Sequence, residues 1–112
     1  MLAEVHAGSV KAVFLTGGYP APWLTPPEIE TLAKPELVVL TDILASPALA
    51  NADYVLPGAA WAEKDGSYVN CEGLQQTTER AVRPPGSARA EGRIFWDLGG
   101  RPRLYHAGHV LR

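Results

Sequence analysis

The 112-residue sequence predicts an α/β fold with a small, mostly parallel sheet of about four strands and flanking helices. Short apolar runs rich in β-branched residues lie at 10–16, 37–41 and 53–56, and helix-start signals separate them. The run at 37–41 is continuously apolar, as expected of a strand covered on both faces of a parallel sheet. The length allows one hydrophobic core, so we expect residues 1–112 to form a single domain.

The first expected strand ends at Gly17-Gly18, where two glycines favour a tight loop. A helix should begin after Thr25, with Pro26 at the first helical position and Glu28 reaching back as in a capping box. We expect this helix to end at Lys34, because the proline that follows disfavours helical geometry in the residue before it.

The elements after the second strand have weaker signals. Ser46 before a proline predicts a short capped helix, which leads into the strand at 53–56. Gly66 is expected to turn the chain with a positive φ into a fourth strand at 67–70. Apolar residues at helical spacing then predict a helix within 87–98, and a short helix is expected at 105–111.

Composition excludes several classes of partner. The formal net charge of −2 gives no electrostatic footprint for nucleic acid. No window approaches the roughly eighteen apolar residues of a membrane helix, so we expect no direct membrane insertion. The single cysteine, Cys71, suits a reducing compartment, and the acidic N-terminus does not resemble a signal peptide, so we expect a cytoplasmic protein.

The Gly17-Gly18 loop and Asp42 form the first candidate site. A glycine-rich turn after one strand and an acid about twenty residues further on are typical of dinucleotide binding. Here, however, the helix starts too far from the glycines to hold a phosphate, so a plain strand-ending turn is the alternative.

Three other groups have ordinary structural interpretations beside their chemical ones. His106 and His109 could share a helix face, but no third metal ligand lies nearby, and a solvated terminal helix explains them. Cys71 is followed by Glu72, whose negative charge disfavours a thiolate, so we interpret it as a packed, inert thiol. The segment 63–66 is interpreted as a polar turn. The residues alone predict no catalytic residue and no metal site.

A long segment of the chain resembles the late part of the molybdopterin oxidoreductase family. The resemblance is carried by Ala52-Asp-Tyr-Val-Leu-Pro-Gly-Ala-Ala-Trp-Ala-Glu-Lys-Asp-Gly-Ser-Tyr-Val-Asn-Cys-Glu-Gly73, then by Gln76 and Arg83-Pro-Pro-Gly86. It extends over about residues 10 to 98, where the first strand and its loop, and the strand ending at Asp42, also keep the family's register. The resemblance implies a Rossmann-like domain that is a portion of a larger subunit.

The family includes formate dehydrogenases, nitrate reductases and the large iron-sulfur subunit of bacterial NADH-quinone oxidoreductase. Members with the cofactor hold a molybdopterin guanine dinucleotide. By this resemblance Gly17, Gly18, Asp42 and Ser46 would be the cofactor-binding positions.

Departures from the family pattern favour the cofactor-free branch, to which the NADH-quinone oxidoreductase subunit commonly belongs. Tyr19 stands where asparagine is usual, Ser46-Pro47-Ala48 where Thr-Glu-Thr is usual, and Leu74 where arginine is usual, so hydrogen-bonding partners for a dinucleotide are lost. The resemblance therefore implies a non-catalytic structural portion of an NADH dehydrogenase subunit that contacts the rest of its subunit and other subunits. The alternative is a fragment of a molybdopterin-dependent formate dehydrogenase.

If the chain is such a structural portion, it carries no cofactor of its own. Asp42 would then cap backbone amides around Leu44 and Ala45.

Overall fold

The computed structural model describes residues 2–107. The chain falls into two compact units, Met1–Pro57 and Gly58–Arg112, and each is described by itself. Whether the whole chain behaves as the expected single domain stays a prediction.

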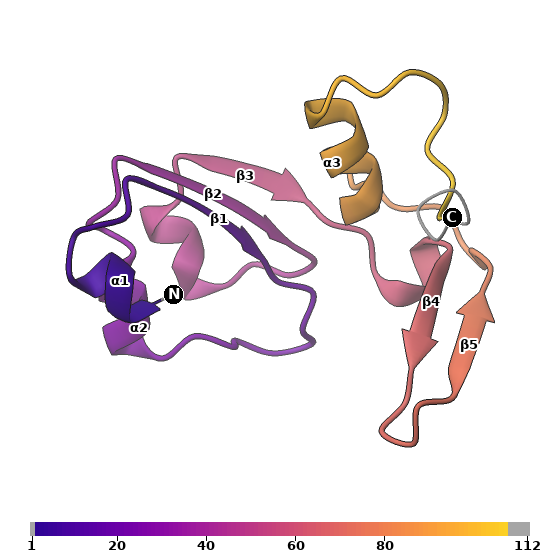
Figure 1. Ribbon diagram of the computed structural model, residues 1–112, viewed down its shortest axis with the longest axis horizontal. Helices are drawn as coiled ribbons and strands as arrows, with labels where there is room; N and C mark the ends of the chain where they lie inside the picture. Colours follow the sequence, from indigo (N-terminus) through magenta and orange to yellow (C-terminus); the bar gives the residue numbers. More distant parts are fainter. Residues whose placement is uncertain (1, 108–112) are drawn as a thin grey trace. The chain divides into compact units, whose positions relative to one another are not determined.

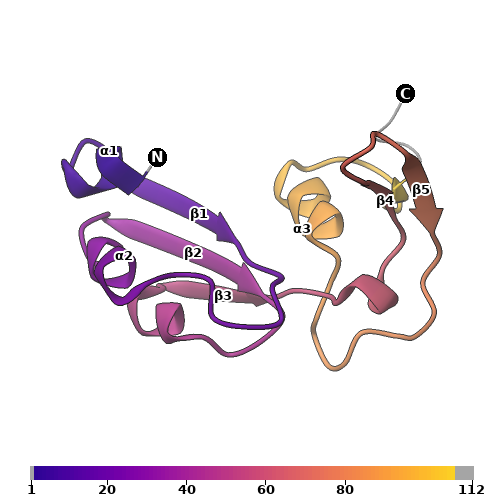
Figure 2. The ribbon, with the colours of Figure 1, turned by 90° about the horizontal axis from the view of Figure 1, so that it is seen from below.

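The first unit is built on a parallel sheet. Its strands are β1 (Ala12–Thr16), β2 (Leu37–Asp42) and β3 (Tyr54–Pro57), in the order β1-β2-β3 (Figure 1). Figure 2 shows β2 between its two neighbours. The predicted α/β class and the parallel pairing are confirmed, but the sheet has three strands rather than about four.

Three short helices lie on one side of this sheet (Figure 1): α1 (Leu2–His6), α2 (Pro26–Thr31) and the 3-10 helix η1 (Pro47–Asn51). Helix α1 was not predicted from the sequence. Alternate residues of β1 and β2 point toward the helices, where they meet one buried side chain from α1, one from η1 and that of Leu32, the residue that follows α2. The buried members of this core are Val5, Val13, Leu15, Leu32, Val38, Leu40 and Ala48.

Helix α2 begins as predicted. The Glu28 carboxylate accepts hydrogen bonds from the backbone N–H and the hydroxyl of Thr25, both at 2.7 Å, and these bonds lower the pKa of Glu28 below its ordinary value. The regular helix ends at Thr31 rather than at Lys34. Residues up to Lys34 instead form i→i−3 bonds, which tighten the last turn and satisfy the terminal carbonyls.

The second unit starts with the short 3-10 helix η2 (Trp61–Glu63) and an antiparallel hairpin of β4 (Gly66–Val69) and β5 (Gln75–Thr78). The predicted fourth strand therefore exists, but it pairs with β5, whose polar sequence has no apolar alternation. Gly66 is the first residue of β4 and does not have the positive φ expected of it. The turn between the strands is closed by Asn70, whose side-chain oxygen accepts two backbone N–H groups.

The last described element is α3 (Glu91–Leu98), which begins four residues later than the start of the predicted segment. Tyr105 packs against Gly92, where a Cβ atom would overlap the tyrosine ring. Tyr105 and His106 are not helical, and most of the helix expected at 105–111 lies outside the described residues.

Candidate functional site at the carboxyl edge of the parallel sheet

The three parallel strands end at the same edge of the sheet (Figure 1). Open α/β sheets bind ligands at this carboxyl edge. The loop after β1 begins here with Gly17, whose N–H donates to the Thr41 carbonyl at 2.7 Å. Asp42 ends the neighbouring strand β2, so the structure brings the predicted glycine loop and the predicted acid together.

The Asp42 carboxylate accepts hydrogen bonds from three donors of its own chain. Oδ1 accepts the backbone N–H of Gly18 at 3.0 Å and that of Ile43 at 2.8 Å. Oδ2 accepts the indole Nε1–H of Trp23 at 3.1 Å. The residue is 9% exposed, so these bonds replace nearly all of its hydration. The expectation that Asp42 caps amides around Leu44 and Ala45 is wrong about the partners.

Each glycine of the loop has a separate reason to be glycine. A Cβ atom on Gly17 would overlap the carboxyl group of Asp42. Gly18 has a φ of +112°, a conformation that residues with a side chain rarely adopt. The Gly17-Gly18 pair therefore lets the backbone approach a carboxylate of the same chain.

Trp23 is the member of this site that was not predicted from the sequence. It is half-buried, packs against the core of the first unit, and lies with its ring centroid 5.7 Å from that of Tyr19. Nothing in the local pattern marks its indole N–H as the partner of an acid nineteen residues away. The available signal was only that a buried indole N–H needs an acceptor.

Ser46 precedes η1 as predicted, but its side chain forms no cap hydrogen bond. Its Oγ atom is buried and has no hydrogen-bond partner among the described residues. Ser46 and Trp23 line the same small void, which leaves no room for a water molecule. The hydroxyl therefore faces a space too narrow to hold a ligand group.

These residues do not fit a guanine dinucleotide as they stand. Asp42 accepts three internal donors, and the Ser46 hydroxyl is enclosed. A nucleotide base would need these acceptors to be free for its own N–H groups.

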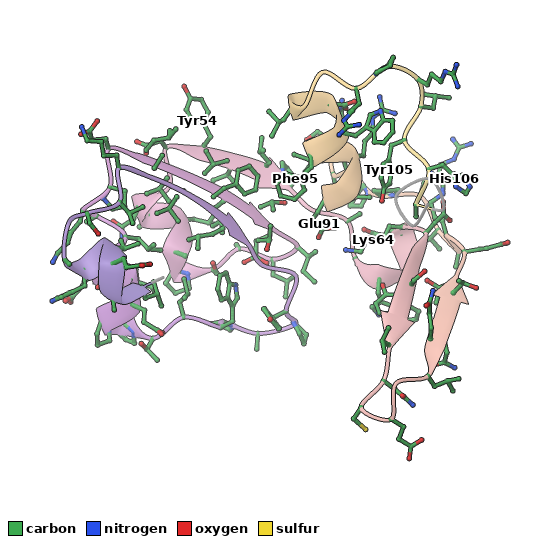
Figure 3. The ribbon with its side chains drawn as sticks, viewed as in Figure 1. Tyr54, Lys64, Glu91, Phe95, Tyr105 and His106 are labelled. Carbon is green, nitrogen blue, oxygen red and sulfur yellow. The ribbon has the colours of Figure 1, made fainter. Side chains whose placement is uncertain are left out.

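The second unit contains a different cluster of charged groups. Lys64 and Glu91 form an ion pair of 2.6 Å, and each side chain is about one-fifth exposed (Figure 3). Burial, then the negative charges of Asp65 and Glu91, raise the pKa of Tyr105 above its ordinary value. A cleft of about 320 Å³ adjoins these groups. The charge of Lys64 in this cleft is neutralised by Glu91, so we interpret the ion pair as a structural contact.

Residues 2–107 offer few other kinds of site. That part of the chain has no group of three or more histidine, cysteine or acidic residues able to hold a metal ion, and no helix long and apolar enough to cross a membrane. Cys71 is a free, exposed thiol, so the expectation that it is packed is wrong, because it lies in the turn between β4 and β5 rather than in a core. His109, one of the two histidines considered as ligands, lies outside the described residues.

Comparison with known proteins identifies the family. The molybdopterin oxidoreductase family matches residues 1–101. The chain is 37% identical over 98 residues to the F420-dependent formate dehydrogenase 1 subunit alpha of Methanococcus maripaludis, which covers 84% of this chain and 14% of the relative. It is 49% identical over 55 residues to an NADH-quinone oxidoreductase subunit of Rickettsia felis, which covers 49% of this chain and 8% of the relative.

A third relative is the 78 kDa subunit of the mitochondrial NADH-ubiquinone oxidoreductase of Candida albicans, with 54% identity over 44 residues, which cover 39% of this chain and 6% of the relative. The chain thus spans 14% or less of the length of these relatives. Because the family match extends over nearly the whole sequence, the chain belongs to the molybdopterin oxidoreductase family.

Proposed function

We propose that this chain is a non-catalytic structural portion of a protein like the large iron-sulfur subunit of NADH-quinone oxidoreductase. One observation carries the proposal: the acid at the ligand edge of the sheet is already bound by Gly18, Ile43 and Trp23 of its own chain. A carboxylate that is held in this way stabilises the edge, and it offers little to an external ligand. The NADH-quinone and NADH-ubiquinone oxidoreductase relatives support the choice of parent.

The proposed partners are the remainder of the parent subunit and other subunits of a respiratory complex. The exposed apolar side chains of the second unit suit such contacts; they include Trp61 at 71% exposure and Leu98 at 66%. The single cysteine suits a reducing compartment, so we place the complex in the cytoplasm or at the cytoplasmic face of a membrane. In this proposal the chain has no redox centre of its own.

A second candidate is supported by the longest of the three matches described above. The formate dehydrogenase subunit alpha aligns with 84% of the chain, against 49% for the NADH-quinone oxidoreductase relative. In this alternative the chain is a portion of a molybdopterin-dependent formate dehydrogenase. The parent would hold a molybdopterin guanine dinucleotide, which supplies the redox chemistry when it is bound. Gly17, Gly18, Asp42 and Ser46 would then have to rearrange before they could contact it.

An activity assay tests the non-catalytic proposal. The purified chain is incubated with formate or with NADH and an artificial electron acceptor, and a heat-treated sample serves as control. We expect equal rates in the two samples, because the chain would need a redox cofactor to transfer electrons. Turnover above the heat-treated control would overturn the proposal. The two candidate parents are distinguished by a separate measurement, the binding of a guanine nucleotide to the chain.

A further inference from the structure

Strand β5 leaves one edge of the hairpin open. It pairs with β4 on one side, and in Figures 1 and 2 no other strand or helix of the described residues runs along its outer side. An isolated two-stranded hairpin is only marginally stable in water, and the outer N–H and C=O groups of an edge strand are a template for a further strand. The outer side of β5 is therefore a surface suited to backbone pairing.

The residues of β5 do not protect this edge. Edge strands are usually kept from pairing with other chains by a charged side chain, a proline or a bulge within the strand. The segment Gln75–Thr78 is uncharged, contains no proline and pairs with β4 without interruption. Gln75, Gln76 and Thr77 are also exposed. A second strand would meet neither a charge nor a backbone irregularity here.

The hairpin turn shows which backbone groups of β5 face outward. The N–H of Asn70 donates to the carbonyl of Leu74 at 3.1 Å, so these two residues form a hydrogen-bonded pair. Hydrogen-bonded and non-hydrogen-bonded pairs alternate along an antiparallel ladder, and the register puts Gln75 and Thr77 in non-hydrogen-bonded pairs. The N–H and C=O groups of Gln75 and Thr77 therefore point away from β4.

A second copy of β5 complements this edge. Two copies related by a two-fold axis exchange their outward groups when Gln75 of each pairs with Thr77 of the other, which places the two Gln76 residues side by side at the axis. Glu72 and Arg80 are equally far along the chain from Gln76, so the same register brings Glu72 of each copy toward Arg80 of the other. Both residues are exposed, and opposite charges across paired strands are stabilising.

The charges select this register over its neighbours. The outward groups could also be exchanged if Gln75 faced Gln75 or if Thr77 faced Thr77 of the second copy. Neither of these registers brings Glu72 toward Arg80 of the second copy. The edge is thus self-complementary in one register, with an uncharged centre and opposite charges at its two ends.

We propose that β5 is an association edge, at which two copies of this chain join their two-stranded hairpins into one continuous antiparallel sheet of four strands. The partner is a second copy because the backbone groups and the charges of this edge complement themselves. The pairing involves the second unit, goes beyond the proposed function and is the same for either candidate parent.

Sedimentation equilibrium of the full chain, over a range of concentrations, measures the association. We expect a monomer–dimer equilibrium that weakens as salt is added, because exposed ion pairs contribute to it. A chain that stays monomeric up to roughly 1 mM overturns the proposal, and it would leave the β5 edge to a strand of another protein.

Thr77→Pro and Ser67→Pro are a matched pair of variants. Each removes an outward N–H from one edge of the hairpin and leaves the bonds between β4 and β5 in place. We expect Thr77→Pro to lower the dimerisation constant at least about tenfold, because each copy loses one bond to the other. Ser67→Pro, on the outer edge of β4, should change it by about twofold or less. Equal effects of the two variants would contradict the pairing through β5.

A charge exchange tests the register. Glu72→Lys should lower the dimerisation constant at least about fivefold, because two attractive pairs become repulsive. Adding Arg80→Glu to the same chain makes the facing charges opposite again, so the double variant should recover most of the loss. A double variant that associates no better than Glu72→Lys alone would contradict the proposed pairing.

Amide hydrogen exchange of the unaltered chain does not depend on a variant folding. The N–H groups of Gln75 and Thr77 should exchange more slowly as the concentration is raised from monomer to dimer, because they enter hydrogen bonds between copies. The N–H groups of Ser67 and Val69, which face outward on β4, are the internal control and should not change. The proposal is wrong if the protection of both strands changes alike.

Discussion

Replacing Asp42 by asparagine should destabilise the first unit strongly although the two side chains have the same shape. Asparagine retains one carbonyl oxygen, which can still accept the N–H groups of Gly18 and Ile43. Its amide nitrogen would then face the indole N–H of Trp23, so two donors would oppose each other where an acceptor now lies. Loss of one hydrogen bond to a charged acceptor costs about 1.5–3 kcal/mol, and the buried donor left unsatisfied adds to this. We expect a total of about 3 kcal/mol.

Asp53→Asn is the matched control, because it makes the same chemical change at a site without the donor conflict. Asp53 Oδ2 accepts one backbone N–H, that of Val38, at 2.7 Å, and an asparagine oxygen can replace it. We expect a cost of about 1 kcal/mol or less.

Urea unfolding followed by tryptophan fluorescence measures both variants. Trp61→Phe and Trp96→Phe are introduced in every sample, so that Trp23 alone reports on the first unit. The reasoning is refuted if Asp42→Asn costs no more than Asp53→Asn, since the Asp42 network would then contribute little.

Three further predictions concern close contacts and pH. Gly17→Ala should lower the free energy of unfolding of the first unit by about 2–3 kcal/mol, because the new methyl group would overlap the carboxyl group of Asp42. Urea unfolding would show this as a lower midpoint, and an unchanged midpoint would contradict the close contact between Gly17 and Asp42. Gly92→Ala should displace Tyr105, seen as loss of the nuclear Overhauser contacts between the tyrosine ring and α3, and retention of those contacts would contradict it. Glu28 has a lowered pKa in the folded chain, so its contribution to stability is present above the ordinary value of 4.5 and is lost as pH falls below it. The difference in melting temperature between wild type and Glu28→Gln should therefore shrink below that pH, and a constant difference would show that the bonds to Thr25 contribute nothing.

Local chemistry made much of the first unit predictable. The strand at 37–41 has the continuous apolar pattern of a covered parallel strand, and β2 occupies Leu37–Asp42. The bond from Thr25 to Glu28 follows from residues three positions apart, which a sequence displays directly. The approach of the Gly17-Gly18 loop to Asp42 followed from strand order and handedness, which bring consecutive parallel strands together.

The errors arose where a contact depends on tertiary structure. The indole of Trp23, in a loop, contacts Asp42 nineteen residues further along the chain. Neither hydrophobic periodicity nor a short sequence motif predicts a contact between residues that far apart. Strand β5 is Gln75-Gln-Thr-Thr78, which has no apolar alternation and is extended because it pairs with β4. Gly66 was expected to have a positive φ, but it is the first residue of β4 and has the extended backbone of a strand.

Calorimetric titration of GMP into the wild-type chain measures whether the carboxyl edge of the parallel sheet is open to a guanine nucleotide. We expect no binding tighter than roughly millimolar, about −4 kcal/mol, because the Asp42 carboxylate is bound by its own chain. The contrary result is tighter binding that disappears in a folded Asp42→Asn variant. That result would show that the carboxylate serves a nucleotide, and it would favour the formate dehydrogenase-like parent.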